Sequence, residues 1–176
     1  MPAVRIQSGE FDMRILGIDP GYAIVGFGVL DFNGYDFKVV RYGAITTQAH
    51  TDFGMRLSDI FDDMNEVIGT YSPDVMSMEK LFFTTNQKTG IDVAQARGVI
   101  LLSAVKSGMP VFEYTPLQVK QSVAGYGKAQ KKQVMEMTRT ILGLPSVPKP
   151  DDTADALALA ICHGHTANAV NMLSGR

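Results

Sequence analysis

The chain has 176 residues, of which 45% are hydrophobic and 19% are charged, and its formal net charge is −2. This length suits a single domain, because one core of this size can bury roughly 70% of the surface that the unfolded chain exposes. No apolar run reaches the roughly 18 residues of a membrane span, so the composition excludes an integral membrane protein and indicates a globular one. Cys162 is the only cysteine, and no signal peptide is recognisable, so we expect a cytoplasmic protein without disulfides.

The predicted elements alternate between strands and helices. In chain order we expect strands over 14–19, 23–31 and 35–46, a helix over 53–71, a strand over 74–81, a helix over 86–106, a strand over 109–114, a short helix after Pro116, and helices over 130–142 and 152–165. The turn sequences Asp19-Pro20-Gly21 and Asn33-Gly34 separate the first three strands. This order predicts an α/β fold with a five-stranded mixed sheet and helices on both faces.

The predicted domain organisation is simple. Residues 1–12 show no period and are expected to form a flexible extension, residues 13–166 form the folded domain, and residues 167–176 form a C-terminal tail.

The charges are segregated along the chain. Residues 52–71 hold five acids and one base, a net charge of −4, whereas residues 115–142 hold five bases and one acid, a net charge of +4. Each run is compatible with a solvated helix face, and the basic one also with local binding of a polyanion.

Two predicted strands end in a carboxylate where an apolar residue would continue the run. Asp19 ends the first strand and Glu79 the fourth. Taken singly, Asp19 suits a turn and Glu79 an exposed strand end. Gly26 and Gly28 share one face of the second strand, which indicates the close approach of a ligand, another chain or a packed helix.

The last predicted helix carries two acids at its start. Asp152 and Asp155 are three residues apart and project from one face of its first turn. Taken by itself, this pair is best explained by capping, with Asp152 as N-cap and Asp155 at the third helical position. Residues 156–162 are apolar on nearly every side, so this helix is expected to be buried, with its acidic end near the sheet.

If these four carboxylates converge, they repel one another unless cations lie between them. Oxygen ligands suit Mg²⁺, and a pair of such ions can promote in-line cleavage of a phosphodiester. We therefore take a two-metal site as a hypothesis whose test is whether the four acids meet.

Four segments carry a resemblance to a known family. They are LGIDPG, MEKLFF followed by ARGV, PVFEYTPLQVKQSVAGYGKAQKKQV, and DDTADALALAICHGH. In this order they resemble the RuvC-type Holliday junction resolvases, from Met13 to about His165. The resemblance implies a ribonuclease H-like fold for residues 13–166 and a structure-selective endodeoxyribonuclease. Such an enzyme resolves Holliday junctions in recombination and DNA repair by paired, symmetrical nicks.

By position, the resemblance places four residues on the metal-binding, catalytic acids of the family: Asp19, Glu79, Asp152 and Asp155. They would hold two Mg²⁺ ions per active site, with Mn²⁺ as an alternative ion, and Asp19 would bridge both. Asp151 adjoins Asp152, and the choice of Asp152 rests on its spacing from Asp155.

The resemblance also implies DNA contacts. Phe82 matches an aromatic residue that stacks on junction bases, although ordinary core packing also explains it. Lys120 and Lys131 match basic residues near the scissile backbone, and Lys128 and Lys132 are weaker candidates for the same surface.

The implied partners are four-way junction DNA, a second copy of the chain, and branch-migration motor proteins of the RuvA and RuvB type. Residues 86–106 match the segment that pairs subunits in the family, but core packing explains their composition as well. No membrane partner is expected.

Some features depart from the family pattern or admit rival readings. Tyr22 follows DPG where a small or polar residue is common, and CHGH offers too few ligands for a structural zinc site. The alternatives are a YqgF-type nuclease, a DNA-binding module whose acids only cap and turn, and an actin-like kinase or ATPase, for which the chain is too short.

Overall fold

The computed structural model describes residues 12–80 and 87–173. Its elements in chain order are β1 (Met13–Asp19), β2 (Ile24–Phe32), β3 (Phe37–Thr46), α1 (Phe53–Tyr71), β4 (Val75–Glu79), α2 (Gln87–Lys106), β5 (Val111–Tyr114), α3 (Pro116–Ala124), α4 (Lys131–Ile141) and α5 (Asp151–Leu173). No helix in these two ranges is both long and apolar enough to cross a membrane.

The strands form one five-stranded sheet in the order β3-β2-β1-β4-β5. The pairs β1–β2 and β2–β3 are antiparallel, while β1–β4 and β4–β5 are parallel. The prediction of a mixed sheet is therefore confirmed, and β1 is its central strand, with β2 and β4 on either side.

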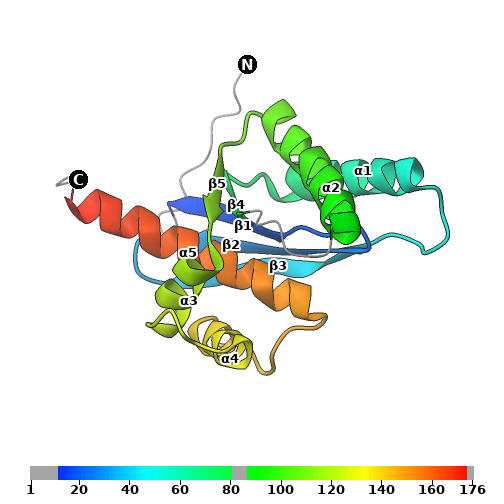
Figure 1. Cartoon of the computed structure of the whole chain (residues 1–176). Coiled ribbons are helices and arrows are strands. Elements are labelled where there is room, and N and C mark those ends of the chain that lie inside the picture. Colours follow the sequence, from blue (N-terminus) through cyan, green and yellow to red (C-terminus); the bar gives the residue numbers. More distant parts are fainter. Residues whose placement is uncertain (1–11, 81–86, 174–176) are drawn as a thin grey trace, which may run out of the picture.

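Helices cover both faces of the sheet, as predicted (Figure 1). One core cluster joins one face to α1 and α2 and includes Leu16, Ile60 and Ile100; the other joins the opposite face to α3, α4 and α5 and includes Ile15, Val134 and Leu157. Ile15 and Leu16 point to opposite faces because side chains alternate along a strand.

Local signals explain where several helices begin. Asp52 caps α1, accepting a hydrogen bond from the Met55 N–H at 3.3 Å. Thr115 and Gln118 form a capping box at the start of α3, with Pro116 as its first residue. The start of α3 matters because this helix contributes one wall of the candidate site.

Glycines in β1 and β2 let α5 lie directly on the sheet. A Cβ at Gly17 would collide with the carbonyl oxygen of Ala156, and one at Gly26 with that of Asp152. The expectation that strand glycines admit a packed helix is confirmed. Ser77 of β4 also donates a hydrogen bond to the Leu159 carbonyl at 2.7 Å.

The last helix differs from the prediction at both ends. It begins at Asp151, so Asp152 lies inside the first turn and is not the N-cap. It continues to Leu173, so the expected end near His165 is wrong, and residues 167–173 extend the helix instead of forming a tail. Gly164 lies inside this helix as a packing residue, since a Cβ there would meet the Phe37 ring.

Candidate active site

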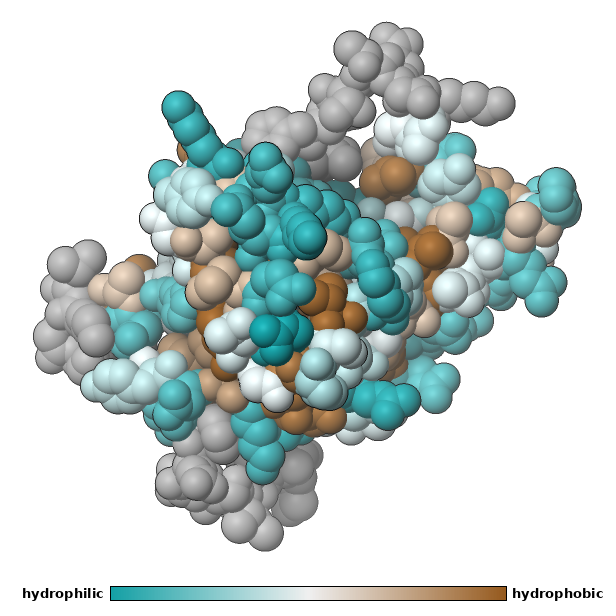
Figure 2. All heavy atoms as spheres, turned by 90° about the horizontal axis from the view of Figure 1, so that it is seen from below, coloured by the Kyte–Doolittle hydropathy of each residue, from teal (hydrophilic) through white to brown (hydrophobic). Residues whose placement is uncertain are grey.

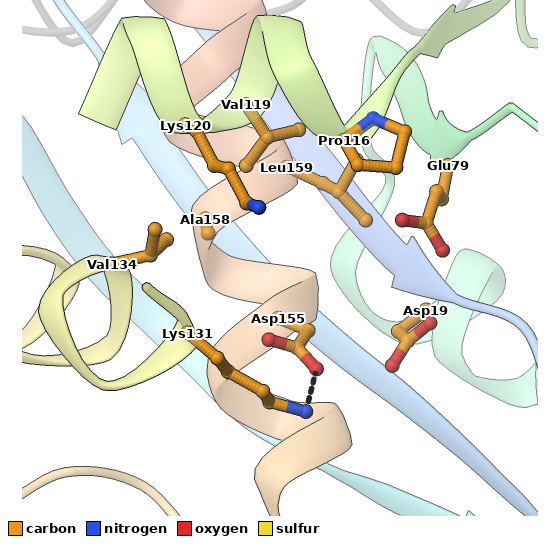
Figure 3. Close-up of a pocket in the computed structure, with 10 residues that line it drawn as sticks. All are labelled: Asp19, Glu79, Pro116, Val119, Lys120, Lys131, Val134, Asp155, Ala158 and Leu159. Carbon is orange, nitrogen blue, oxygen red and sulfur yellow. Dashed lines mark ion pairs between the residues drawn. The ribbon is translucent and has the colours of Figure 1, made fainter. Parts of the chain in front are cut away.

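A pocket of about 310 Å³ opens where the C-terminal ends of β1 and β4 meet the helices α3, α4 and α5 (Figure 3). Its walls are formed by Asp19, Glu79, Pro116, Val119, Lys120, Lys131, Val134, Asp155, Ala158 and Leu159. Three acids and two lysines thus share a partly apolar pocket, and they come from five different elements.

The parallel pairing of β1 and β4 brings Asp19 and Glu79 together. Gly17 pairs with Ser77 and Ile18 with Met78, so the next residue of each strand is an acid at the same edge of the sheet. Figure 3 shows both carboxylates on one wall of the pocket. The C-terminal edge of parallel strands is a common place for ligand sites in α/β folds.

The third acid of the pocket comes from α5. Asp155 faces the two strand-end acids because the glycine-lined strands let this helix lie close to β1 and β2. Asp152, one turn earlier, is half-buried and does not line the pocket, although its charge acts on Asp19. The structure thus places three of the four expected acids on one pocket, with the fourth next to it.

The neighbouring Asp151 takes another partner. Its carboxylate accepts a hydrogen bond from Lys149 Nζ at 2.6 Å, and this bond lowers the Asp151 pKa. The charge of Asp152 raises the pKa of Asp19 and of Asp155, whereas the charge of Asp151 raises the pKa of Asp155 and of Lys131. Both acids therefore act on residues of the pocket, and Asp151 is the one that is paired with Lys149.

The pocket destabilises negative charge. Burial raises the pKa of Asp19 to about 8, and the charges of Asp155, Glu79 and Asp152 add to the effect. Burial, and then the charge of Asp155, raises the pKa of Glu79. Burial also raises the pKa of Asp155, against the opposing effect of Lys131. A cluster of this kind binds either protons or a cation.

Lys131 supplies a positive charge inside the pocket. Its Nζ lies 2.8 Å from Asp155 Oδ2, and this hydrogen bond raises the lysine pKa (Figure 3). Lys120 reaches the pocket from α3. Both lysines therefore lie beside the acids.

The remaining DNA-contact candidates lie elsewhere. Lys128 and Lys132 are exposed and do not line the pocket. Seen from the α4 side, hydrophilic side chains cover much of the surface, with small apolar areas between them (Figure 2). Phe82 falls in 81–86, outside the described residues.

The arrangement is a set of oxygen ligands around a pocket and not a closed coordination sphere. Within residues 12–80 and 87–173, no group of three or more His, Cys, Asp or Glu side chains is placed to hold a metal ion as it stands. The CHGH histidines serve packing: His163 Nδ1 lies 2.7 Å from the Tyr114 hydroxyl, and His165 Nδ1 lies 3.1 Å from Ser122 Oγ.

Sequence reasoning missed two features of the pocket. The first is its apolar wall, which includes Val119, Val134 and Leu159. The Thr115–Gln118 capping box marks the start of α3, and this signal could have indicated the orientation of Val119. The ion pair between Lys131 and Asp155 has no sequence signal, because the partners are too far apart in the chain for a helical spacing rule to apply.

Comparison with known proteins gives a consistent result. Residues 15–163 match the family model described as crossover junction endodeoxyribonuclease RuvC. A Brevibacillus brevis relative of that name is 55% identical over 163 residues, covering 93% of this chain and 98% of the relative. A relative of the same name from Alkaliphilus oremlandii is 53% identical over 160 residues, covering 91% and 98%.

A solved structure also superposes closely. It is described as T. thermophilus RuvC in complex with Holliday junction substrate, and it matches with a TM-score of 0.86 and 34% identity over 90% of this chain and 97% of that one. The predicted ribonuclease H-like fold is confirmed. Because the family model spans most of the chain and these relatives are more than half identical over nearly all of it, the chain belongs to the RuvC family of crossover junction endodeoxyribonucleases.

Proposed function

We propose that this chain resolves four-way DNA junctions in recombination and repair by paired, symmetrical nicks, and that hydrolysis takes place in the pocket of Asp19, Glu79 and Asp155. The observation that carries the proposal is the meeting of these acids with Lys120 and Lys131 in one pocket of a RuvC-family chain. Carboxylates beside lysines suit a phosphodiester, since the acids hold cations and the lysines neutralise phosphate.

RuvC-type nucleases are metal-dependent, and the chemistry of this pocket fits divalent ions. Its acids are hard oxygen ligands, and burial together with mutual repulsion raises the pKa of Asp19 to about 8. We propose two Mg²⁺ ions per site, with Mn²⁺ as an alternative, held by Asp19, Glu79, Asp155 and Asp152. Asp152 is preferred to Asp151 because Asp151 is paired with Lys149.

Bound divalent ions would supply an activated water and stabilise the charge that develops on the scissile phosphate. The chain's own residues would orient the substrate. Lys120 on α3 and Lys131 on α4 would hold the phosphate backbone, and Val119, Val134 and Leu159 would limit the access of bulk water to the pocket.

DNA binding would extend beyond the pocket. The exposed Lys128 and Lys132 lie in the loop before α4 and in its first turn, close in sequence to Lys131, and are proposed to contact phosphates. Phe82, outside the described residues, is proposed to stack on a junction base, a contact worth about 1–3 kcal/mol.

Paired nicks require two active sites, and α2 offers a surface for a second copy of the chain. Ile91, Leu102 and Val105 are 55%, 51% and 69% exposed. At intervals of 11 and 3 residues they share one face of α2, while Ala96 and Ile100 face the core. We propose a homodimer through this face, working in the cytoplasm with branch-migration motors of the RuvA and RuvB type.

The decisive experiment compares substrates under one condition. With Mg²⁺, the protein should nick a four-way junction and leave plain duplex, flap and RNA–DNA hybrid largely uncut, and Asp19→Asn should abolish cleavage. Cutting of duplex or hybrid at the junction rate would contradict junction selectivity. An Asp19→Asn variant as fast as the parent would contradict the metal site.

A further inference from the structure

The turn that follows Asp19 is tied to the start of α1 by an arginine. Arg56 Nε donates a hydrogen bond to Thr47 Oγ1 at 2.8 Å, and Arg56 Nη2 donates to the Tyr22 carbonyl at 3.3 Å. The Thr47 hydroxyl donates in turn to the same carbonyl at 2.6 Å. One backbone oxygen, three residues after Asp19, therefore accepts two hydrogen bonds.

Ring contacts reinforce the hydrogen bonds. The Arg56 guanidinium carbon lies 4.8 Å from the centre of the Tyr22 ring, within cation–π range. The Phe53 ring also packs against Tyr22, with 6.0 Å between the ring centres.

Arg56 is directed to the turn and not to an acid. Among the described residues it forms no ion pair, although α1 carries several carboxylates, and its side chain is half-buried. Its donors go to a hydroxyl and a main-chain carbonyl.

The path from Tyr22 back to Asp19 is short and stiff. Pro20 has a restricted φ angle, and Gly21 is so close to the Ile24 carbonyl that a Cβ would collide with it. The Thr47 N–H also donates to the Ala23 carbonyl at 3.0 Å, which closes the far end of the turn. A restraint on the Tyr22 carbonyl therefore also restrains the position of Asp19 at the end of β1.

Asp19 needs such a restraint because its neighbours repel it. It faces the carboxylates of Glu79 and Asp155 across the pocket, with Asp152 nearby and the Lys131 ammonium as the facing cation. A ligand that can swing away from like charges loses affinity for the ion it should hold.

We propose that Arg56 is a positioning residue for Asp19, acting through Thr47 and the Tyr22 carbonyl to hold this carboxylate where it binds the divalent ion. The inference rests on the proposed metal-dependent function. It assigns a role to a residue that touches neither the pocket acids nor the substrate.

The chain offers a matched control on the same strand. Arg14, at the start of β1, is also half-buried; its Nη1 donates to the Tyr71 carbonyl at 2.8 Å, and its Nε and Nη2 donate to Asp31 at 2.7 and 2.9 Å. Arg14→Met removes a comparable network at the end of β1 away from Asp19.

The test measures Mn²⁺ binding to the full chain by isothermal titration calorimetry without DNA. It also measures the Mg²⁺ midpoint, which is the Mg²⁺ concentration at half-maximal junction cleavage, and Tm. Arg56→Met should weaken Mn²⁺ binding and raise the Mg²⁺ midpoint by about 10-fold, the usual scale for a group that orients a metal ligand. Arg14→Met should lower Tm and leave both metal readouts within about twofold. Arg56→Lys should recover part of the loss, because an ammonium can reach one of the two acceptors.

Thr47→Val keeps the arginine but removes the hydroxyl link, so it should shift Mn²⁺ affinity in the same direction even if Arg56→Met does not fold. Parent-like Mn²⁺ affinity in Thr47→Val or in folded Arg56→Met would overturn the positioning role. Equal losses in Arg14→Met would also overturn it, since they would reflect general destabilisation. A parent chain that binds no Mn²⁺ would overturn the metal site itself, and the positioning role with it.

Discussion

At the residue scale, the surroundings of Asp19 make the negative charge of its carboxylate unfavourable. Its carboxylate ends β1 and is largely buried among Glu79, Asp155 and Asp152, and its pKa rises to about 8. The folded state therefore keeps a proton that the unfolded state, with an ordinary pKa of about 3.9, has already released. Between about pH 4 and 8, the free energy of unfolding should fall as pH rises in the absence of divalent ions.

Asp19→Asn removes this charge while keeping the shape of the side chain. In EDTA at pH 8 the variant should exceed the parent in free energy of unfolding by roughly 2–4 kcal/mol, and the difference should vanish near pH 4. Urea unfolding at several pH values measures this, with Asp62→Asn, exposed on α1, as the control that keeps the parent's pH dependence. If the parent's free energy of unfolding at pH 8 equals or exceeds that of the variant, the charge of Asp19 does not destabilise the folded state.

Lys131 and Lys132 are adjacent in sequence but differ in place. Lys131 lines the pocket and pairs with Asp155, whereas Lys132 is exposed outside it. Lys131→Met should lower the single-turnover cleavage rate at saturating enzyme by about 100-fold, the scale of losing one charge-stabilising donor. Lys132→Met should weaken junction binding and reduce its salt dependence by about one unit of slope, with little change in that rate. Equal effects on the rate would remove the distinction between pocket and surface.

At the scale of elements, the site depends on how closely α5 approaches the sheet. Gly17 and Gly26 leave room for the main chain of α5, and the first turns of that helix carry Asp152 and Asp155. The position of these acids is therefore set by residues of β1 and β2 that carry no functional group.

Gly17→Ala tests this packing. The added methyl would collide with the Ala156 carbonyl, so we expect a loss of about 3 kcal/mol or more in the free energy of unfolding. Gly69→Ala, exposed on α1 with open space around its Cβ position, should instead gain roughly 0.5–1 kcal/mol. Urea denaturation of both variants measures the pair, and a stable Gly17→Ala protein would mean that α5 lies farther from the sheet.

At the scale of the whole molecule, the pocket and the proposed dimer surface lie in different layers of helices. The pocket opens among β1, β4, α3, α4 and α5, and the apolar face of α2 belongs to the opposite layer of helices (Figure 1). A dimer through α2 would thus leave each pocket free for DNA, which is what paired cutting requires.

Leu102→Glu tests the dimer. Light scattering after size exclusion should show a dimeric parent and a monomeric variant, because a charge would be buried in the interface. On a cruciform plasmid the variant should yield single nicks instead of linear product. Met55→Glu, at a position 57% exposed on α1, should remain a dimer. A monomeric parent, or a dimeric Leu102→Glu protein, would contradict the proposed interface.

Most of the fold could be read from the sequence because its signals are local. The turn sequences after β1 and β2 and the hydrophobic periodicity of the helices act within a few positions, and they place most elements within a few residues of those observed. The expected end of α5 near His165 was wrong, because the helix continues to Leu173 and Gly164 packs against Phe37 inside it.

The sequence by itself determined the order of the elements, the mixed sheet, and the acids Asp19, Glu79, Asp152 and Asp155 as candidates. Only the tertiary structure decided that three of these acids line one pocket, that Asp152 lies beside it, that Lys131 pairs with Asp155, and that Arg56 holds the turn after Asp19. The reason is physical: periodicity and capping depend on near neighbours, whereas burial, ion pairing and carboxylate repulsion depend on distances between segments that meet only when the chain folds.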